Sequence, residues 1–556
     1  MTRRIRFCVG VAAIALLGCA SLLPAQDARP RAFTESQGTP EAKKAYDEGR
    51  TAMGTRDDAL AAKAFRRAID LDPAFVDAHF YYVFAYEAAA FNFDMAANNG
   101  DAAARDRARD ELRAFYRARA DADPHNPINH WALGQAAGNY VDAEAHYLKA
   151  LEVEPGFARA YQDLALIAEF RGDTARELEY RRKAAELNPD DPQYLFYYAS
   201  SVRDDEALYR KLSLQVAEKF PTHERGAQAL YWLGIRSKDP ADKIAMLERL
   251  RRDFPPDKFG WSESGLLALY ELYAETDVAK ARALAQQMAG SGEPRSRKTW
   301  EGLLAYDTAL AEARDLIAAR KGADAVARLK DVKPPRMADP VAFELVQAEA
   351  LAASGDAAGA YARLVGRLAK EPSAAVHEAA VRYGAAAGKS QADLGRDVWA
   401  RRDEAAKPAP PFTLHAYRTG KPVSLSDYAG KVVLVNFWYP ACGPCRGEFP
   451  YLQKVVERFK GRPFQVLALN GHPVEDPFVL PFMDGNRYDF FPLHATEDVV
   501  KAYGVRGYPA NFLVDGAGRI MFTPRLHDDK TQAVLEAQIE ELLNRPAAGA
   551  LSPGDR

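Results

Sequence analysis

Two cysteines separated by two residues, in the motif Cys-Gly-Pro-Cys at 442–445, are the residues of this chain best suited to chemistry. The only other cysteines, Cys8 and Cys19, lie in an N-terminal segment with the layout of an export signal. Export would leave a single pair of thiols, too few for a framework of structural disulfides. A zinc site would need two further Cys or His ligands, and the chain has no second Cys-x-x-Cys and no His-x-x-x-His motif. The pattern favours a redox-active dithiol over a metal site.

The two thiols are expected to have different roles. We expect a helix that begins at Cys442 and runs to Phe459. Its first backbone N–H groups and the positive end of its dipole would then face the sulfur of Cys442, which favours the thiolate that attacks a disulfide. Cys445 lies one turn further on and is assigned as the resolving thiol that breaks the mixed disulfide. Pro444 in the first turn costs no helical hydrogen bond.

The elements around this motif alternate between short apolar runs and helical stretches, which predicts an α/β domain. The run at 431–438 is β-branched and apolar, as in a buried central strand. A second strand after the helix would be parallel to it, if that helix is the usual crossover. The predicted elements are strands at 431–438, 464–469, 510–514 and 519–522, a turn at 439–441, a hairpin turn at 515–518 and a closing helix at 530–543.

Two motifs carry a specific resemblance. Asn-Phe-Trp-Tyr-Pro-Ala-Cys-Gly-Pro-Cys-Arg-Gly-Glu-Phe-Pro at 436–450 and Tyr-Gly-Val-Arg-Gly-Tyr-Pro at 503–509 resemble the exported TlpA/ResA branch of the thioredoxin superfamily, over about 408–543. The resemblance implies a thioredoxin-like fold and a thiol–disulfide oxidoreductase without a resident cofactor. It also implies that Pro509 is a cis-proline facing the cysteine pair, where an incoming substrate peptide binds, and that Trp438 packs beside the site.

Three positions near the motif bear on its chemistry. Thioredoxin has a buried aspartate where this chain has Asn436, which cannot take up a proton. Glu448 stands where the TlpA/ResA branch keeps an active-site glutamate, which implies an acid/base partner for the thiols; the alternative is a solvated helix carboxylate. Tyr508 precedes the proline where this branch more often has Thr or another small residue, and its bulk bears on partner range and redox poise.

The N-terminus has the pattern of a secretory signal. Three arginines precede an apolar run at 7–18, which is shorter than the roughly 20 residues of a permanent membrane span. The run ends in Leu-Leu-Gly-Cys, which resembles a bacterial lipobox and implies a lipid on Cys19. The alternative is a soluble exported protein, cleaved nearer residue 20 or 25.

The region between the signal and the redox motif is Ala-rich and helical by periodicity. Pro155 and Pro189 are 34 residues apart, as are Pro221 and Pro255, and this is the tetratricopeptide period. The region is long enough for about ten helical hairpins, which must stack to bury their apolar faces. Prolines in like contexts occur at Asp72-Pro73, Glu154-Pro155, Asn188-Pro189, Phe220-Pro221 and Phe254-Pro255.

The predicted fold class is an all-α solenoid of tetratricopeptide-like hairpins followed by an α/β thioredoxin-like domain. The consecutive prolines at 407–411 predict a stiff linker between the two. The expected boundaries are a signal peptide at 1–19, a tether at 20–40, the helical repeats at 41–404, the thioredoxin-like domain at 405–545 and a disordered tail at 546–556.

Two aromatic clusters in the helical region could line a peptide groove, but their helical spacing favours the core between repeats. The clusters are Phe80, Tyr81, Tyr82, Phe84 and Tyr86, and Tyr194, Phe196, Tyr197 and Tyr198.

Charge and composition limit the classes of partner that the chain is expected to bind. With 74 basic and 77 acidic residues the chain offers no electrostatic case for nucleic acid, and a lipid on Cys19 is the one predicted membrane contact. The expected partners are protein disulfides or thiols, a membrane thiol-transfer protein as electron donor, and another protein bound by the repeats. We favour a disulfide reductase. The alternatives are a scaffold whose thioredoxin-like domain only docks, and a thiol peroxidase, although Tyr439 stands where a peroxidase has Thr or Ser.

Overall fold

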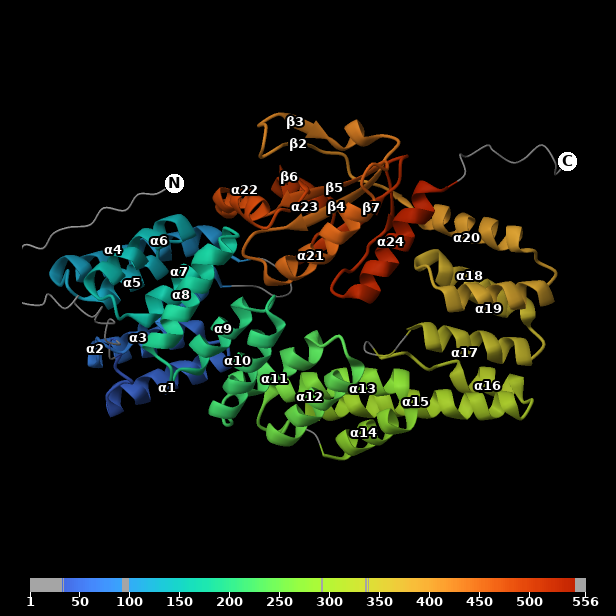
Figure 1. The fold of residues 1–556 in the computed structure, drawn as a ribbon, viewed down its shortest axis with the longest axis horizontal. Helices are drawn as coiled ribbons and strands as arrows, with labels where there is room; N and C mark the ends of the chain where they lie inside the picture. Colours follow the sequence, from blue (N-terminus) through green and yellow to red (C-terminus); the bar gives the residue numbers. More distant parts are fainter. Residues whose placement is uncertain are drawn as a thin grey trace, which may run out of the picture.

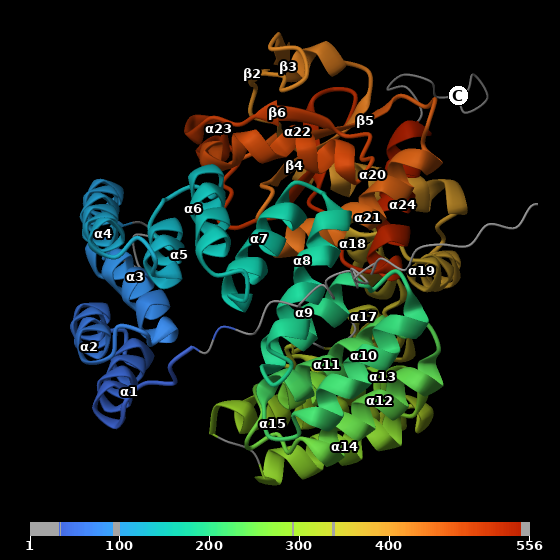
Figure 2. The ribbon, with the colours of Figure 1, turned by 60° about the vertical axis from the view of Figure 1, so that its left-hand side comes forward.

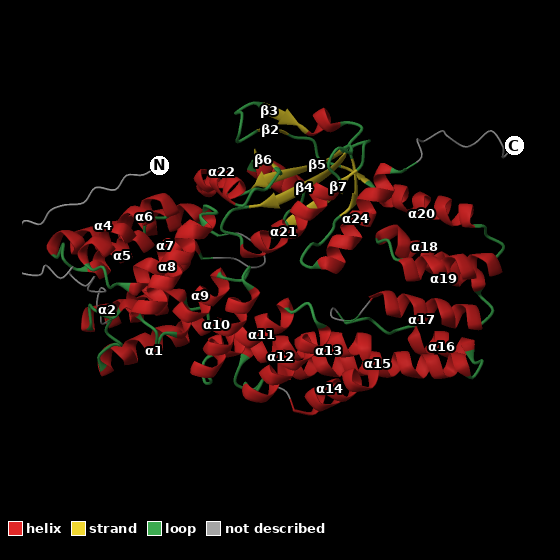
Figure 3. Ribbon diagram, in the orientation of Figure 1, coloured by secondary structure: helices red, strands yellow, loops and turns green. Residues whose placement is uncertain are grey.

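The computed structural model describes residues 33, 35–92, 100–291, 294–335, 338 and 340–545. The expected signal peptide with Cys8 and Cys19, most of the expected tether, and the expected tail at 546–556 lie outside these residues. Figure 1 shows two parts, a long helical array and a C-terminal domain, and Figure 3 shows the strands confined to the latter. Within the described ranges no helix is long and apolar enough to cross a bilayer.

The array consists of helices α1 to α20 in antiparallel succession, which confirms the predicted solenoid of helical hairpins. The helices are α1 (Pro40–Gly54), α2 (Asp58–Leu71), α3 (Val76–Phe91), α4 (Ala102–Ala122), α5 (Pro127–Gln135), α6 (Tyr140–Val153), α7 (Ala158–Phe170), α8 (Thr174–Leu187), α9 (Pro192–Ser201), α10 (Glu206–Lys219), α11 (Glu224–Arg236), α12 (Pro240–Asp253), α13 (Gly260–Thr276), α14 (Val278–Ser291), α15 (Pro294–Ala318), α16 (Gly322–Leu329), α17 (Pro340–Ala353), α18 (Ala357–Lys370), α19 (Ala374–Ala386) and α20 (Gln391–Ala405).

The prolines of the repeat pattern end the second helix of a hairpin. Pro155 follows the C-cap of α6, and Pro189 follows the C-cap of α8. A proline at this place cannot continue the helix. Small residues bring the paired helices together: a side chain at Gly49 would meet the ring of Phe65 at 2.7 Å. The spacing of small residues and prolines therefore has the structural meaning that the sequence predicted.

Eight of the nine aromatic residues in the two clusters contribute to the array's core. Tyr82, Tyr194 and Phe196 are buried in it, and the others except Phe84 pack against it half-buried. Phe84 is 56% exposed. The interpretation as inter-repeat core holds for all but this residue.

The C-terminal domain contains one six-stranded mixed sheet and a two-stranded hairpin. The strand order in the sheet is β1-β8-β7-β4-β5-β6. Its elements are β1 (Lys407–Pro408), β2 (Thr413–His415), β3 (Pro422–Ser424), the 3-10 helix η1 (Leu425–Tyr428), β4 (Val432–Trp438), α21 (Gly443–Arg458), β5 (Phe464–Asn470), the 3-10 helix η2 (Pro473–Glu475), α22 (Asp476–Gly485), β6 (Phe491–His494), α23 (Glu497–Ala502), β7 (Ala510–Val514), β8 (Arg519–Phe522) and α24 (Asp529–Leu543).

β4 is the central strand, and all seven of its residues are buried. It pairs in parallel with β5 through the crossover helix α21 and antiparallel with β7, which forms a hairpin with β8. This arrangement confirms the four predicted strands and the α/β class. The sequence analysis did not predict β6, α22, α23 or the β2–β3 hairpin.

The first part of the expected linker at 407–411 is instead part of the sheet. Lys407 and Pro408 form β1, which pairs antiparallel with β8, and the N–H of Ala409 donates to the carbonyl of Gly518 over 2.9 Å. The prolines prevent a helix as expected. They are compatible with an edge strand, because the outer side of such a strand makes no ladder hydrogen bonds. Only Ala406 separates α20 from β1.

The described end of the expected tether lies against the array. The N–H of Phe33 donates to the carbonyl of Gly156 over 3.0 Å, and its ring contacts Phe157 with centroids 5.4 Å apart. The hydroxyl of Ser36 donates to Asp72. In this part the segment packs against helices and does not hang free from them.

The array curves around the C-terminal domain in both views (Figures 1 and 2). Contacts join α22 to α7 and β8 to α20. The domain therefore contacts the array near its covalent junction and at α7, and an ion pair between Lys530 of α24 and Glu275 of α13 forms a further contact.

Candidate active site

Cys442 and Cys445 lie where β4 passes into α21. Cys442 is the N-cap of α21, and its Sγ accepts a hydrogen bond from the N–H of Cys445 over 3.2 Å. The two residues are joined by a disulfide, with Cα atoms 5.2 Å apart. The N–H of Cys445 in the first turn of α21 therefore points toward the sulfur of Cys442, which is the arrangement that stabilises a thiolate. Trp438 lies beside the pair in the same core cluster.

Glu448 is buried, not solvated. It is 1% exposed and accepts hydrogen bonds from Nδ2 of Asn436 over 2.7 Å and from Nδ2 of Asn511 over 3.0 Å. Burial raises the pKa of Glu448 to about 7, although the hydrogen bonds from Asn511 and Asn436 lower it. A carboxyl group with this pKa can take up or release a proton near neutral pH.

The side-chain amide of Asn436 links Glu448 to Asn511, and these three residues form what we call the Glu448 cluster. Nδ2 of Asn436 also donates to Oδ1 of Asn511 over 2.8 Å, while Oδ1 of Asn436 is buried without a hydrogen-bond partner. The side chain that replaces thioredoxin's aspartate is thus a donor to Glu448. The group that can take up a proton here is therefore Glu448 on α21, and not a residue of β4.

The loop before β7 presents an aromatic surface near the cysteines. The peptide bond between Tyr508 and Pro509 is cis. The ring of Tyr439 stacks on His472 with centroids 4.1 Å apart and meets Tyr508 edge-on at 5.2 Å. Burial lowers the pKa of His472. Tyr439 and Tyr508 pack against the core cluster that contains the cysteine pair.

A second buried carboxylate holds the turn that precedes Cys442. Glu475, in η2, is 5% exposed, and its Oε2 accepts a hydrogen bond from the N–H of Ala441 over 2.6 Å. Burial raises the pKa of Glu475 to about 7, against the lowering effects of this hydrogen bond and of Arg446. Glu475 therefore fixes the residue directly before Cys442.

The comparisons with known proteins concern this domain. Residues 404–539 match the Redoxin family model. The thiol-disulfide oxidoreductase ResA of Bacillus subtilis (strain 168) is 31% identical over 145 residues, which cover 26% of this chain and 76% of the relative. The ResA protein of Bacillus thuringiensis subsp. konkukian is 30% identical over 142 residues, covering 25% and 79%.

The chain belongs to the ResA family of thiol-disulfide oxidoreductases. This confirms the resemblance seen in the two sequence motifs. A solved thiol:disulfide interchange protein from Bacteroides sp. is 29% identical, covers 26% of this chain and 94% of its own, and has a TM-score of 0.23.

The sequence analysis missed two polar residues of this ResA-type site. Asn511 lies two residues after Pro509 in an apolar strand, and the one available signal was that polar interruption. Glu475 comes from a loop after β5 that carries no recognisable motif. Both reach the site because β5 and β7 flank β4 in the sheet.

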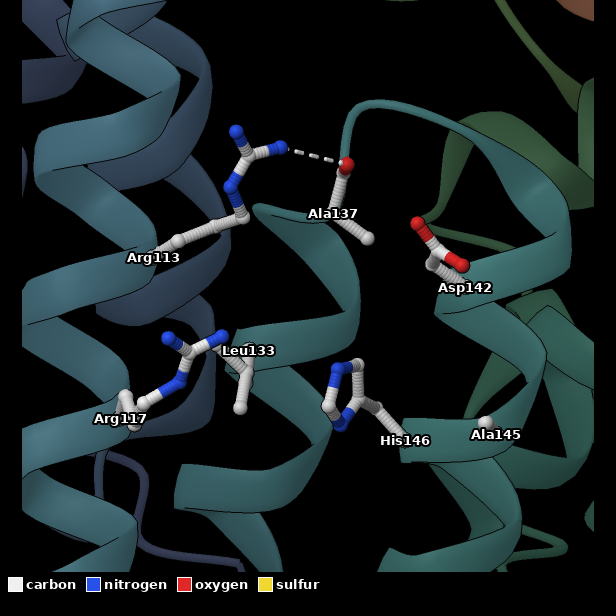
Figure 4. Close-up of a pocket in the computed structure, with 7 residues that line it drawn as sticks. All are labelled: Arg113, Arg117, Leu133, Ala137, Asp142, Ala145 and His146. Atoms are coloured by element: carbon white, nitrogen blue, oxygen red, sulfur yellow. Dashed lines mark hydrogen bonds between the residues drawn. The ribbon is translucent and has the colours of Figure 1, made fainter.

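The described residues also form a hollow of about 420 Å³ in the array, between α4, α5 and α6 (Figure 4). Arg117 and His146 point toward each other across it, and Arg113 donates to the carbonyl of Ala137 at its rim. No residue of the redox pair or of the Glu448 cluster lines it. Among the residues that the structure describes, no cluster of three or more His, Cys, Asp or Glu could hold a metal ion.

Proposed function

We propose that the chain is an exported thiol-disulfide oxidoreductase that reduces disulfides in extracytoplasmic proteins through Cys442 and Cys445. The observation that carries the proposal is the cysteine pair at the start of α21, with a buried carboxyl group of pKa about 7 one turn behind it. Membership of the ResA family supports the class of reaction.

In the proposed reaction the reduced pair gives two electrons to a client disulfide. The thiolate of Cys442 attacks one client sulfur, the client S–S bond breaks, and the other client sulfur leaves as a thiolate that takes a proton from water. Cys445 then passes its proton to the carboxylate of Glu448. Its thiolate attacks the sulfur of Cys442, so the mixed disulfide breaks, the disulfide of this chain forms, and the client leaves reduced.

Each turnover consumes the dithiol, so an outside dithiol must restore it. We propose a membrane thiol-transfer protein as this donor and the helical array as the part that recruits client proteins. Pro509 is proposed to bind the client's backbone next to the pair. A lipid on Cys19 would hold the chain at the membrane surface where the donor lies.

Trapping tests the dithiol mechanism directly. In the Cys445→Ser variant the mixed disulfide on Cys442 cannot resolve, so the variant should retain client proteins that reductant releases. The Cys442→Ser variant is the control and should retain none. Retention by neither variant, together with no reduction of a small aromatic disulfide such as dithiobis(nitrobenzoate) by the wild-type chain, would refute the proposal.

The reduction potential decides the direction of electron flow. A reductase requires a potential low enough to favour the oxidised pair, near that of thioredoxin at about −270 mV. We expect a value in this range by equilibration with thiol buffers. A value near that of a strong oxidant, about −120 mV, would reverse the direction proposed here.

A further inference from the structure

The attacking sulfur lies in a covered part of the molecule. Cys442 is 3% exposed. A client disulfide must come within bonding distance of this sulfur, so the arrangement seen here admits no protein substrate. Tyr439 and Tyr508 of the C-terminal domain pack against the core cluster that contains Cys442, and the preceding residue, Ala441, packs against the array.

An ion pair joins the array to the residue that follows the cysteine motif. The guanidinium of Arg446 contacts Oε1 of Glu169, at the end of α7, over 3.0 Å and lies 5.0 Å from the ring centroid of Phe170. The same guanidinium donates to the carbonyl of Pro440, in the turn before Cys442, over 3.1 Å. Both charged side chains are less than one-fifth exposed. The array thus binds the first turn of α21 and the turn before it.

Apolar contacts extend the same interface. Ala441, the neighbour of Cys442, packs against the N-terminal core of the array. Phe478 of α22 is buried in that core, with its ring 6.0 Å from that of Tyr140 and the guanidinium of Arg171 at 5.3 Å. The turn that carries the attacking cysteine is therefore seated on helices from another part of the chain.

Two glycines also lie against each other at this interface. A Cβ on Gly485, the last residue of α22, would meet the carbonyl oxygen of Gly172 at 2.5 Å and that of Arg171 at 3.1 Å. A Cβ on Gly172 would meet Nδ2 of Asn486 at 2.7 Å. Backbone atoms cannot withdraw as a flexible side chain can. The docked arrangement therefore has no room for a side chain on Gly485.

We infer that the α6–α7 part of the array covers the redox centre of its own chain, and that a client protein must displace this part to reach Cys442. The inference rests on the proposed function, because it concerns access of protein disulfides to that cysteine. The array and the client would compete for the same face of the C-terminal domain. The domain would stay attached through α20 and β1 while the α7–α22 contact opens.

A side chain added at Gly485 tests this cover without changing any residue of the active site. In Gly485→Ala the three nearest atoms to the new methyl group all belong to the array, so the substitution opposes docking but fits the helix of its own domain. Gly395→Ala in α20 is the matched control, because nothing lies within 4 Å of its added methyl group. Glu169→Gln is a second variant, which keeps the side chain's shape but removes the ion pair with Arg446 and also the one with Arg181 inside the array.

The measurement is the rate at which Cys442 reacts, in the full chain with Cys445→Ser, with a bulky polyethylene-glycol maleimide and with iodoacetamide. Overpacking against backbone atoms opposes docking, so Gly485→Ala should raise the bulky reagent's rate about tenfold. Glu169→Gln should raise it about threefold. The rate with iodoacetamide should change less in both, and Gly395→Ala should match the parent. Circular dichroism checks that each variant is folded.

The outcomes separate the cover from the proposed function. Equal bulky-reagent rates in the parent, Gly485→Ala and Glu169→Gln chains would overturn the cover, whatever the enzyme does with small disulfides. Rates that rise equally for both reagents in the folded variants would also overturn it, because they would indicate a change in the sulfur's reactivity and not in access. Loss of all thiol chemistry in the wild-type chain would instead refute the proposed function.

Discussion

Replacing Glu448 with glutamine should change the stability of the C-terminal domain in opposite directions at acid and alkaline pH. The folded domain holds this carboxyl group with a pKa of about 7, against an ordinary value of 4.5. Between these two pH values the folded chain keeps the proton and the unfolded chain does not. The stability that the protonated Glu448 contributes is therefore fully present below about pH 4.5 and is lost as the pH rises through 7.

The size of the effect follows from the shift. One pH unit corresponds to about 1.4 kcal/mol, so ionising Glu448 costs the oxidised domain about 3 kcal/mol at pH 8. Glutamine avoids this cost, but its amide group meets Nδ2 of Asn511, so one hydrogen bond is lost at about 1 kcal/mol. The variant should be about 2 kcal/mol more stable than the wild type at pH 8 and about 1 kcal/mol less stable at pH 3, where the carboxyl group is protonated in both states.

Hydrogen exchange resolves this domain from the array in the full chain. Amide protection in β4 and α21 reports the opening free energy of the domain at each pH, once intrinsic exchange rates are taken into account. A variant that is less stable by the same amount at both pH values would refute the reasoning, because Glu448 would then titrate at its ordinary pKa. Glu457→Gln, on an exposed face of α21, is the control and should show neither effect.

Three further predictions concern the residues around the pair. The rate of mixed-disulfide resolution by Cys445 should rise about tenfold between pH 6 and pH 8 as Glu448 ionises, and stopped-flow measurements on Glu448→Gln should show no inflection near pH 7. Glu475→Ala should destabilise the domain by about 1–3 kcal/mol because the N–H of Ala441 loses its acceptor, whereas Glu475→Gln should retain most of the stability in the same exchange experiment. Asn511→Asp should place a second carboxylate against Glu448 and move the inflection of the resolution rate upward by about one pH unit; an unchanged inflection would contradict the contact.

The sequence predicted the parts of the site that a local pattern records. A β-branched run, a Cys-x-x-Cys motif and a proline before a strand locate β4, the start of α21 and the loop of Pro509. The position of Glu448 on α21 was equally readable, but its burial was not. Burial depends on Asn436 and Asn511, which belong to two strands that become neighbours only in the folded sheet.

The repeat period predicted stacked hairpins, but it did not predict that the stacked helices contact the C-terminal domain. Pro155 and Pro189 mark helix ends because a proline acts within its own turn. The contact between Gly172 and Gly485 joins residues more than 300 positions apart, and no local pattern records it. The start of the segment at 407–411 was misinterpreted as a linker for the same reason, since only the position of β8 shows that Lys407 and Pro408 lie at a sheet edge.

The pairing of β1 with β8 affects how the sheet meets other chains. An open edge strand exposes unpaired N–H and C=O groups on which a second protein can add a strand and begin to aggregate. Here Pro408, which has no N–H to offer, stands in the strand at one edge, and the N–H of Tyr417 donates to the carbonyl of Pro492 at the other. The chain segment that joins the two domains thus also helps to protect the sheet against edge-to-edge association.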